Sequence, residues 1–210
     1  MNRREQALRV IKELKREYPD AGTLLKFNNN FELAVAVALS AQTTDDRVNQ
    51  VCGPLFARFP TPEAMAAADL EVLEEFIRPV GLYRNKAKHI KAMAQTIVER
   101  YAGRVPDSLE ELLGLPGLGR KSANVILAVA FGKPGLGVDT HVQRVAWRLG
   151  LANSDKPAQT ELELKALLPI NQWGPAHHLL IFHGRKVCKA RRPECQSCRI
   201  RPICEQKLDK

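Results

Sequence analysis

The chain has 210 residues, of which 45% are hydrophobic and 26% charged, a composition that is ordinary for a globular protein with an apolar core. Its longest apolar runs, 33–39 and 125–131, are far shorter than the roughly 18–20 residues of a membrane span, which excludes a transmembrane protein. The first 18 residues stay charged throughout and do not resemble a signal peptide, so we expect a cytoplasmic protein.

The charge of the chain is strongly positive. The formal net charge is +9 and the pI is about 9.5, which indicates a polyanionic partner such as nucleic acid. Residues 181–210 hold nine Lys or Arg and three Asp or Glu, so 9 − 3 gives +6 of this charge. A solvated basic tail is the alternative to a binding surface.

Hydrophobic periodicity predicts helices along almost the whole chain. The first helix places five apolar side chains on one face and ends before Pro19; these are Ala7, Val10, Ile11, Leu14 and Tyr18. The apolar segment 31–39 fits a buried helix. Further helices are expected at 45–58, 63–67, 70–77, 85–101, about 120–131, from Asp139 to near Gly150, 159–167 and 175–183. Because no segment alternates with period two, the fold class is all-α.

A capping box and a tight turn precede the helix at 120–131. Ser108 and Glu111 can satisfy each other's backbone donors, and the short helix that they begin should stop at Gly114. Residues 115–119 read Leu-Pro-Gly-Leu-Gly. Their glycines leave N–H groups uncovered beside a helix N-terminus, which can hold a phosphate. An ordinary connection between two helices is the alternative.

Two charged residues near this turn are candidates for chemistry. Lys121 lies in the first turn of its predicted helix, where the dipole disfavours the charged form, and a neutral amine is what Schiff-base chemistry needs. A plain surface lysine is the simpler interpretation. Asp139 precedes the next helix, where an N-cap is the simpler interpretation. A capping carboxylate stays ionised, so it can also stabilise a developing cation.

Four of the five cysteines lie close together near the C-terminus. Cys188, Cys195, Cys198 and Cys204 are separated by six, two and five residues. In a cytosolic chain, such a group indicates a metal centre rather than disulfides. Only one pair is short, and the longer outer gaps suit a [4Fe–4S] cluster, although zinc stays an alternative. Cys52 stands apart and is predicted to be a buried, inert thiol.

The loop between the first two of these cysteines carries three positive charges, on Lys189, Arg191 and Arg192. A metal centre would hold both ends of the loop. Such a basic loop loses less entropy when it meets a phosphate backbone, so we expect it to contact DNA or RNA.

Together these features resemble the endonuclease III group of helix-hairpin-helix DNA glycosylases. The matching segments are LPGLGRKSAN (115–124), GVDTH (137–141) and the four-cysteine pattern, with LSAQTTD (39–45), GLYRNKA (81–87) and HGR (183–185) also similar. They run from about residue 31 to 204. The chain departs from the family at 28–31, where Asn-Asn-Asn-Phe stands in place of the Pro that often precedes Phe.

The resemblance implies two helical domains. A six-helix barrel would span 22–135 and include a helix-hairpin-helix motif at about 108–131. Residues 1–21 and 136–210 would form a discontinuous second domain, whose four cysteines hold one [4Fe–4S] cluster. A DNA-facing cleft would lie between the two.

The resemblance also implies roles for individual residues. Lys121 would be the catalytic nucleophile and Asp139 the catalytic aspartate. Gln42 would fill the gap left by an extruded base, and Leu82 would act as a wedge on the opposite strand, with a core leucine as the alternative at 82. Other expected contacts to DNA are Leu115, Gly117, Gly119, Arg120, Lys189, Arg191 and Arg192. His141 receives no role.

The implied activity is that of a bifunctional DNA glycosylase and abasic-site lyase. It would remove oxidised pyrimidines from duplex DNA through a lysine Schiff base and cut 3′ to the lesion by β-elimination. We expect a monomer that is cytoplasmic and associates with the nucleoid when bound to DNA. The alternatives are an adenine-mismatch glycosylase, which normally lacks a lysine at position 121 and carries a further C-terminal domain, a non-catalytic hairpin DNA-binding module and a zinc-stabilised regulator.

Overall fold

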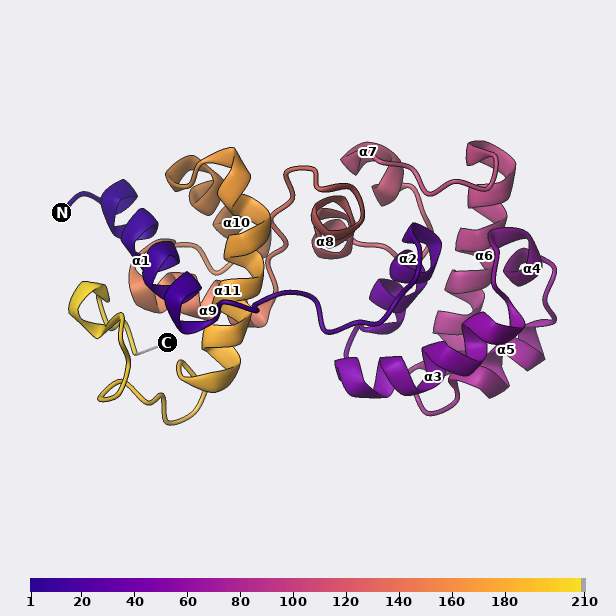
Figure 1. Ribbon diagram of the computed structural model, residues 1–210, viewed down its shortest axis with the longest axis horizontal. Helices are drawn as coiled ribbons and strands as arrows, with labels where there is room; N and C mark the ends of the chain where they lie inside the picture. The colour runs from indigo at the N-terminus through magenta and orange to yellow at the C-terminus, as the bar shows by residue number, and fades with distance from the viewer. Residues whose placement is uncertain (209–210) are drawn as a thin grey trace. The chain divides into compact units, whose positions relative to one another are not determined.

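The structure is a computed structural model that describes residues 1–208. Within this range it has eleven α-helices, two 3₁₀ helices and no strand, so the predicted all-α class is confirmed (Figure 1). No helix in this range is both long and apolar enough to cross a membrane. The chain divides into two compact units, and each has its own hydrophobic core. The cysteine unit comprises Met1–Thr23 and Pro134–Lys210, and the hairpin unit comprises Leu24–Lys133.

The hairpin unit is built around one buried helix. Every residue from Phe31 to Leu39 is buried, and this segment forms α2, which packs against α3, α6 and α8. Burial on all sides explains why the segment lacks a polar face. The helices of this unit are α2 (Asn30–Leu39), α3 (Asp45–Arg58), α4 (Pro62–Ala66), α5 (Leu70–Ile77), α6 (Tyr83–Tyr101), α7 (Leu109–Leu113) and α8 (Arg120–Phe131).

The cysteine unit joins the N-terminal helix to the C-terminal half of the chain. The predicted apolar face of the first helix is buried against this half, where α1 packs on α11. The four α-helices are α1 (Arg3–Glu17), α9 (Thr140–Leu149), α10 (Pro157–Leu167) and α11 (Trp173–Lys186), with 3₁₀ helices at Ile170–Gln172 and Arg201–Ile203.

Four helix starts differ from the predicted ones, and two of them have one physical reason. The helices predicted at 63–67 and 159–167 begin instead at Pro62 and Pro157. Proline favours the first helical position because its missing N–H would have no partner there. The helices predicted at 85–101 and 175–183 begin at Tyr83 and Trp173, and the second extends to Lys186.

The predicted capping box is only half formed. The Ser108 hydroxyl accepts the Glu111 backbone N–H at 3.3 Å, as expected. The Glu111 carboxylate, however, accepts the Ser108 hydroxyl at 2.6 Å and not the backbone N–H of that residue. A complete box, which the sequence analysis missed, lies at the start of α1, where Asn2 and Glu5 exchange both bonds.

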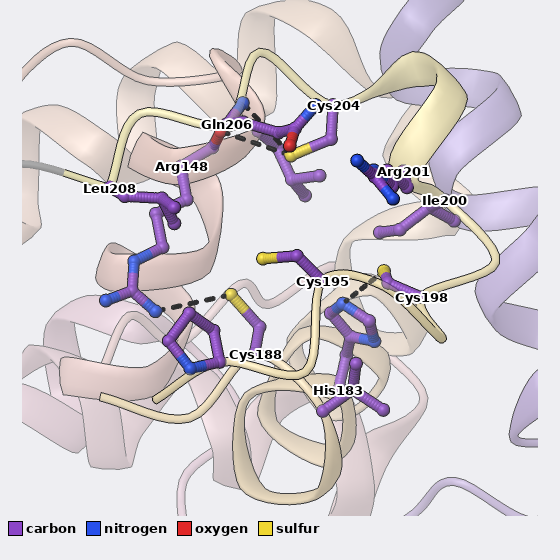
Figure 2. A pocket seen from close by; sticks show the side chains of 13 residues that line it. Arg148, His183, Cys188, Cys195, Cys198, Ile200, Arg201, Cys204, Gln206 and Leu208 are labelled. Carbon is purple, nitrogen blue, oxygen red and sulfur yellow. Dashed lines mark hydrogen bonds between the residues drawn. The ribbon is translucent and has the colours of Figure 1, made fainter. Parts of the chain in front are cut away.

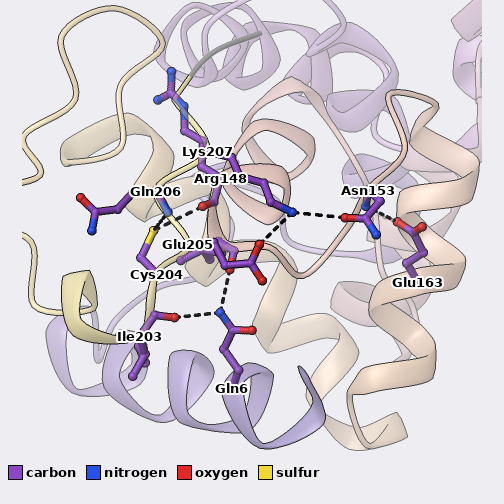
Figure 3. A network of polar contacts seen from close by, with 10 residues as sticks. Gln6, Arg148, Asn153, Glu163, Ile203, Cys204, Glu205, Gln206 and Lys207 are labelled. Carbon is purple, nitrogen blue, oxygen red and sulfur yellow. Dashed lines mark hydrogen bonds and ion pairs between the residues drawn. The ribbon is translucent and has the colours of Figure 1, made fainter. Parts of the chain in front are cut away.

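The end of the chain is tied to α1 and α9 by a polar network (Figure 3). The buried Gln6 amide donates to the carbonyls of Leu149 at 2.7 Å and Ile203 at 2.8 Å. Gly150 ends α9 with φ +79°, and a Cβ at this position would overlap the carboxylate of Glu205. Glycine at 150 therefore suits the left-handed backbone that ends α9, and it leaves room for the Glu205 carboxylate.

We expect Gly150→Ala to destabilise the fold. The left-handed conformation should cost about 1–2 kcal/mol, and displacement of the flexible Glu205 side chain should add little to this. The control is Gly22→Ala, where the nearest atom of a non-adjacent residue to an added Cβ is the Asp20 carbonyl oxygen at 4.0 Å and the backbone is not left-handed, so stability should change little. Chemical denaturation of both variants checks the prediction. Equal midpoints would contradict the account of Gly150.

Candidate functional site

The turn between α7 and α8 is closed by its own backbone and anchored in the core. The Leu118 N–H donates to the Leu115 carbonyl at 3.2 Å, and both leucine side chains are buried. Gly117 has φ +82°, and a Cβ there would lie 2.9 Å from the Cβ of His89 on α6. Since the side chain of Leu115 lies in the core, only its backbone is left to contact a ligand.

This turn presents backbone donors next to a helix N-terminus. Within residues 1–208, the N–H groups of Gly117 and Gly119 donate no hydrogen bond. Gly119 is the N-cap of α8 and provides no side-chain cap. Arg120 is exposed, and the half-buried Lys121 is the second residue of the helix. The turn thus combines open donors, a helix dipole and two basic residues, an arrangement that suits a phosphate.

Gln42 and Leu82 lie on two loops that approach each other. Both have left-handed backbones, with φ 54° and φ 58°, a conformation that costs an ordinary residue about 1–2 kcal/mol. A Cβ added to Gly81 would lie 3.9 Å from the carbonyl oxygen of Gln42. The alternative that Leu82 is a core leucine is wrong, because its side chain is 63% exposed.

Lys86 is a buried residue of this region that the sequence analysis missed. It is only 7% exposed, and its Nζ donates to the Leu39 carbonyl at 2.9 Å, the Ala41 carbonyl at 2.5 Å and the Thr43 hydroxyl at 3.0 Å. Burial lowers the pKa of Lys86. Lys86 lies in the segment GLYRNKA (81–87), but no neighbouring residue in the sequence indicates that its ammonium would point inward.

Asp139 has the predicted cap geometry. Its Oδ1 accepts the Val142 N–H at 2.8 Å at the start of α9. The buried His177 donates from Nδ1 to the Gly137 carbonyl at 2.7 Å, which fixes the backbone just before Asp139. Asp139 and Lys121 belong to different units.

Arg144 connects the helix of Asp139 to the first cysteine. Its guanidinium donates to the carbonyls of Gly184 at 2.9 Å and Cys188 at 3.1 Å, and lies 3.1 Å from Nδ1 of His141. Burial lowers the pKa of His141, and the nearby guanidinium of Arg144 acts in the same direction, while the Asp139 carboxylate opposes them. The lowered pKa favours the uncharged ring, which avoids repulsion from the guanidinium.

The four C-terminal cysteines line a single pocket (Figure 2). All four are free thiols and none is fully buried. Among residues 1–208, no three His, Cys, Asp or Glu side chains are grouped closely enough to hold a metal ion. Nitrogen donors nevertheless approach three of the sulfurs: Arg148 lies 3.6 Å from Cys188, His183 lies 3.7 Å from Cys198, and the Gln206 N–H lies 3.3 Å from Cys204.

His183 is held in one orientation between Cys198 and Tyr18. Its Nδ1 lies 3.2 Å from the Tyr18 hydroxyl, while Nε2 faces the sulfur. Burial lowers the pKa of His183 to about 4 and raises the pKa of Tyr18 to about 12. The ring is therefore neutral and the phenol protonated at neutral pH, so Tyr18 can donate to Nδ1 and leave the proton on Nε2 for the sulfur.

Arg148 anchors the predicted basic loop and was also missed from sequence. Its buried guanidinium donates to the carbonyls of Lys189 at 2.7 Å and Ala190 at 3.0 Å. The Lys189 ammonium pairs with Glu194 at 2.5 Å, so part of the predicted charge of the loop is neutralised internally. Arg191 and Arg192 are exposed and supply the remaining charge.

Cys52 is buried, as predicted, on α3 of the hairpin unit. Its side chain is 2% exposed. Burial and then the nearby carboxylate of Glu32 raise its pKa to about 12. A thiol that stays protonated is a poor nucleophile and a poor metal ligand, which explains its predicted inertness.

Comparisons with known proteins identify relatives along nearly the whole chain. The model of the HhH-GPD superfamily base excision DNA repair protein matches residues 35–169. Endonuclease III of Bacillus subtilis (strain 168) is 47% identical over 92% of this chain and 90% of the relative. The Synechocystis endonuclease III is 44% identical over 97% and 93%. A solved structure of a trapped endonuclease III–DNA covalent intermediate superposes with a TM-score of 0.93 at 43% identity, covering 98% of this chain and 97% of the other.

We expect Gly117→Ala to disturb the hairpin. The added methyl would need a left-handed backbone and would press on His89, so the variant should lose about 1–3 kcal/mol of stability. Gly119→Ala is the matched comparison for stability, because a Cβ there meets nothing within 4 Å and its φ of −103° suits alanine. Thermal melting of both variants checks this. If Gly119→Ala were the less stable of the two, the assigned role of Gly117 would be wrong.

Proposed function

Because the chain belongs to the endonuclease III family within the HhH-GPD superfamily of base excision DNA repair proteins, we propose that it removes oxidised pyrimidines from duplex DNA and then cuts the strand. Membership of this family makes the chain a DNA glycosylase and abasic-site lyase that binds DNA. The lesion class, the nucleophile and the route of strand cutting are the proposed elements.

The position of Lys121 carries the proposal. Its amine lies in the first turn of α8, directly after the open amides of the hairpin. A backbone phosphate bound at those amides would bring the adjoining sugar close to the lysine. A relative 43% identical to this chain has been trapped as a covalent intermediate with DNA, which supports an enzyme-borne nucleophile.

The proposed reaction proceeds in three steps. The neutral Lys121 amine attacks C1′ of the flipped nucleotide, the bond from C1′ to the base breaks, and the base leaves with the bonding electron pair. Transfer of a proton from the bound amine to the ring oxygen O4′, as the C1′–O4′ bond breaks, then converts this intermediate to a protonated Schiff base. Loss of a C2′ proton expels the 3′ phosphate by β-elimination, which cuts the strand 3′ to the lesion.

Asp139 is proposed to stabilise the positive charge that develops on the sugar. Its cap bond to Val142 uses Oδ1, and Oδ2 accepts no hydrogen bond from residues 1–208. The cap holds the carboxylate in one orientation. The cap therefore leaves Oδ2 available for the proposed catalytic role.

Gln42 and Leu82 are proposed to fill the space that the flipped nucleotide leaves. An unpaired, unstacked hole in duplex DNA costs a few kcal/mol, and a damaged pyrimidine is the cheapest base to extrude because it already stacks and pairs poorly. Both side chains are exposed on adjoining loops, as insertion requires.

A [4Fe–4S] cluster is proposed at the four cysteines of the C-terminal pocket. The donor set suits such a group, since four free thiols share one pocket and nitrogen donors approach three of the sulfurs. The thiols would have to draw closer together to share one centre. Burial raises the pKa of Cys198 and Cys204, so a positive metal centre would be needed to hold them as thiolates. When bound, the cluster would stabilise the structure and hold both ends of the basic loop. Arg148 holds Lys189 and Ala190 in that loop, which is proposed to contact phosphates.

Of the alternatives, an adenine-mismatch glycosylase is disfavoured by the lysine at position 121, and a zinc-stabilised regulator by family membership. A panel of duplexes that carry thymine glycol, other oxidised pyrimidines, abasic sites and mispaired adenine separates the lesion classes. We expect incision at the first three and none at mispaired adenine.

We expect Lys121→Gln to lose the covalent adduct that borohydride traps on abasic or thymine-glycol duplex, because glutamine has no nucleophilic amine. Binding to the same duplex should stay within about threefold, since the hairpin amides are unchanged. Gel-shift and trapping assays measure both. A trapped adduct in this variant would show that another residue is the nucleophile.

We expect the purified protein to be brown and to contain iron and sulfide, and Cys198→Ser to lower the iron content, solubility and DNA affinity together. Cys52→Ser is the matched control, because Cys52 lies in the other unit, and its iron content should be unchanged. Elemental analysis and absorption spectra measure this. Stoichiometric zinc without iron would rule out the cluster.

A further inference from the structure

Two strained, exposed residues lie side by side at the edge of the hairpin unit. Gln42 and Leu82 come from loops 40 positions apart, yet both adopt left-handed backbones, and Gly81 lies against the carbonyl of Gln42. Neither residue is a glycine, so the conformation has to be imposed by contacts around it.

Lys86 supplies contacts to both loops. Its backbone N–H donates to the Leu82 carbonyl at 3.1 Å, as the first hydrogen bond of α6. Its ammonium bonds the carbonyls of Leu39 at 2.9 Å and Ala41 at 2.5 Å and the hydroxyl of Thr43 at 3.0 Å. These acceptors bracket Gln42 on both sides, so one residue holds the backbone on either side of Gln42 and the backbone of Leu82.

Burying the ammonium of Lys86 costs desolvation free energy, which an apolar residue with a purely structural role would avoid. The side chain is 7% exposed, and within residues 1–208 it forms no ion pair. Desolvation disfavours the ammonium, as its lowered pKa indicates. An apolar side chain in such a site is often as stable as a buried charge. An ammonium, however, has three donors, and here each meets one acceptor of the loop.

We propose that Lys86 is a positioning residue for insertion into DNA: by bonding the 39–43 loop and the start of α6, it holds Gln42 and Leu82 in adjoining, exposed conformations before DNA arrives. The inference rests on the proposed function, because it takes these two side chains to be the ones that fill the hole in the duplex. Lys86 acts through them and touches neither the sugar nor the base.

Single-stranded DNA distinguishes this role from general support of the fold. A duplex has a stack to be opened and a hole to be filled, whereas an abasic single strand has neither. Loss of positioning should therefore slow reaction on duplex and spare Schiff-base formation on the single strand. Loss of the fold should slow both equally.

The experiment uses the full chain and compares Lys86→Met with Lys91→Met. Lys91 lies on the same helix and donates to one backbone carbonyl, that of Ala68 at 2.6 Å, away from the loop of Gln42. Base removal is measured under single-turnover conditions on thymine-glycol duplex, and borohydride trapping on an abasic single strand. We expect Lys86→Met to slow the duplex reaction about tenfold, which is about 1.4 kcal/mol, and to leave trapping within about twofold. Lys91→Met should leave both within about twofold.

A double-mutant cycle tests whether Lys86 acts through Leu82. If it does, adding Lys86→Met to Leu82→Ala should slow the duplex reaction by less than about threefold instead of a further tenfold. Lys86→Arg, which keeps the charge and several donors, should recover part of the loss. Thr43→Val removes one acceptor and leaves Lys86 in place, so it tests the same contact if Lys86→Met fails to fold. It should slow only the duplex reaction, by about two- to threefold.

Three outcomes would overturn the inference. The first is full activity of Lys86→Met on duplex. The second is an equal loss on duplex and single strand in both Lys86→Met and Thr43→Val, and the third is that Lys86→Met and Leu82→Ala have additive effects on the duplex reaction. Failure of the proposed function looks different. In that case the unaltered protein would neither excise thymine glycol nor form a trapped adduct on either substrate.

Discussion

Helix ends leave backbone N–H and carbonyl groups without partners, and the way in which this all-helical protein satisfies them decides where its candidate chemistry lies. Asp139 caps α9, Leu82 precedes α6, and the hairpin leaves the amides at the start of α8 open. Helix interiors have no such spare groups. Among residues 1–208, which form no strand, several of the candidate site residues therefore lie at the beginnings of helices.

Each unit uses one buried cation to organise a connection. Lys86 gathers the oxygens around Gln42, and Arg148 gathers the carbonyls that follow Cys188. In both cases the partners are neutral oxygens rather than carboxylates. A neutral oxygen orients the cation by a hydrogen bond but does not neutralise its charge. Each unit therefore combines a fixed loop with a positive charge, which suits a polyanionic partner.

Features that depend on short-range patterns were predictable from the sequence, and features that depend on distant partners were not. The helix ends at Gly114 and Gly150 and the cap at Asp139 follow from residues within one turn. The roles of Lys86 and Arg148 could not be predicted, because the carbonyl oxygens that accept their hydrogen bonds lie 45 and 41 positions away in the sequence. The exposure of Leu82 could not be derived either, because a leucine among helical segments is normally buried and nothing local marks a left-handed conformation. The discontinuous grouping of the chain was predicted only through family resemblance.

The contrast between Cys52 and the other thiols has a consequence for damage by oxidants. Oxidation proceeds through the thiolate, and Cys52 is buried with a pKa raised to about 12. The other four cysteines are partly accessible and line one pocket. The cysteines that peroxide would reach first are those of the pocket in the unit that holds the basic loop, because Cys52 of the other unit is protected by its burial. Oxidation is therefore expected to alter the pocket next to the loop that Arg148 holds before it alters the hairpin unit.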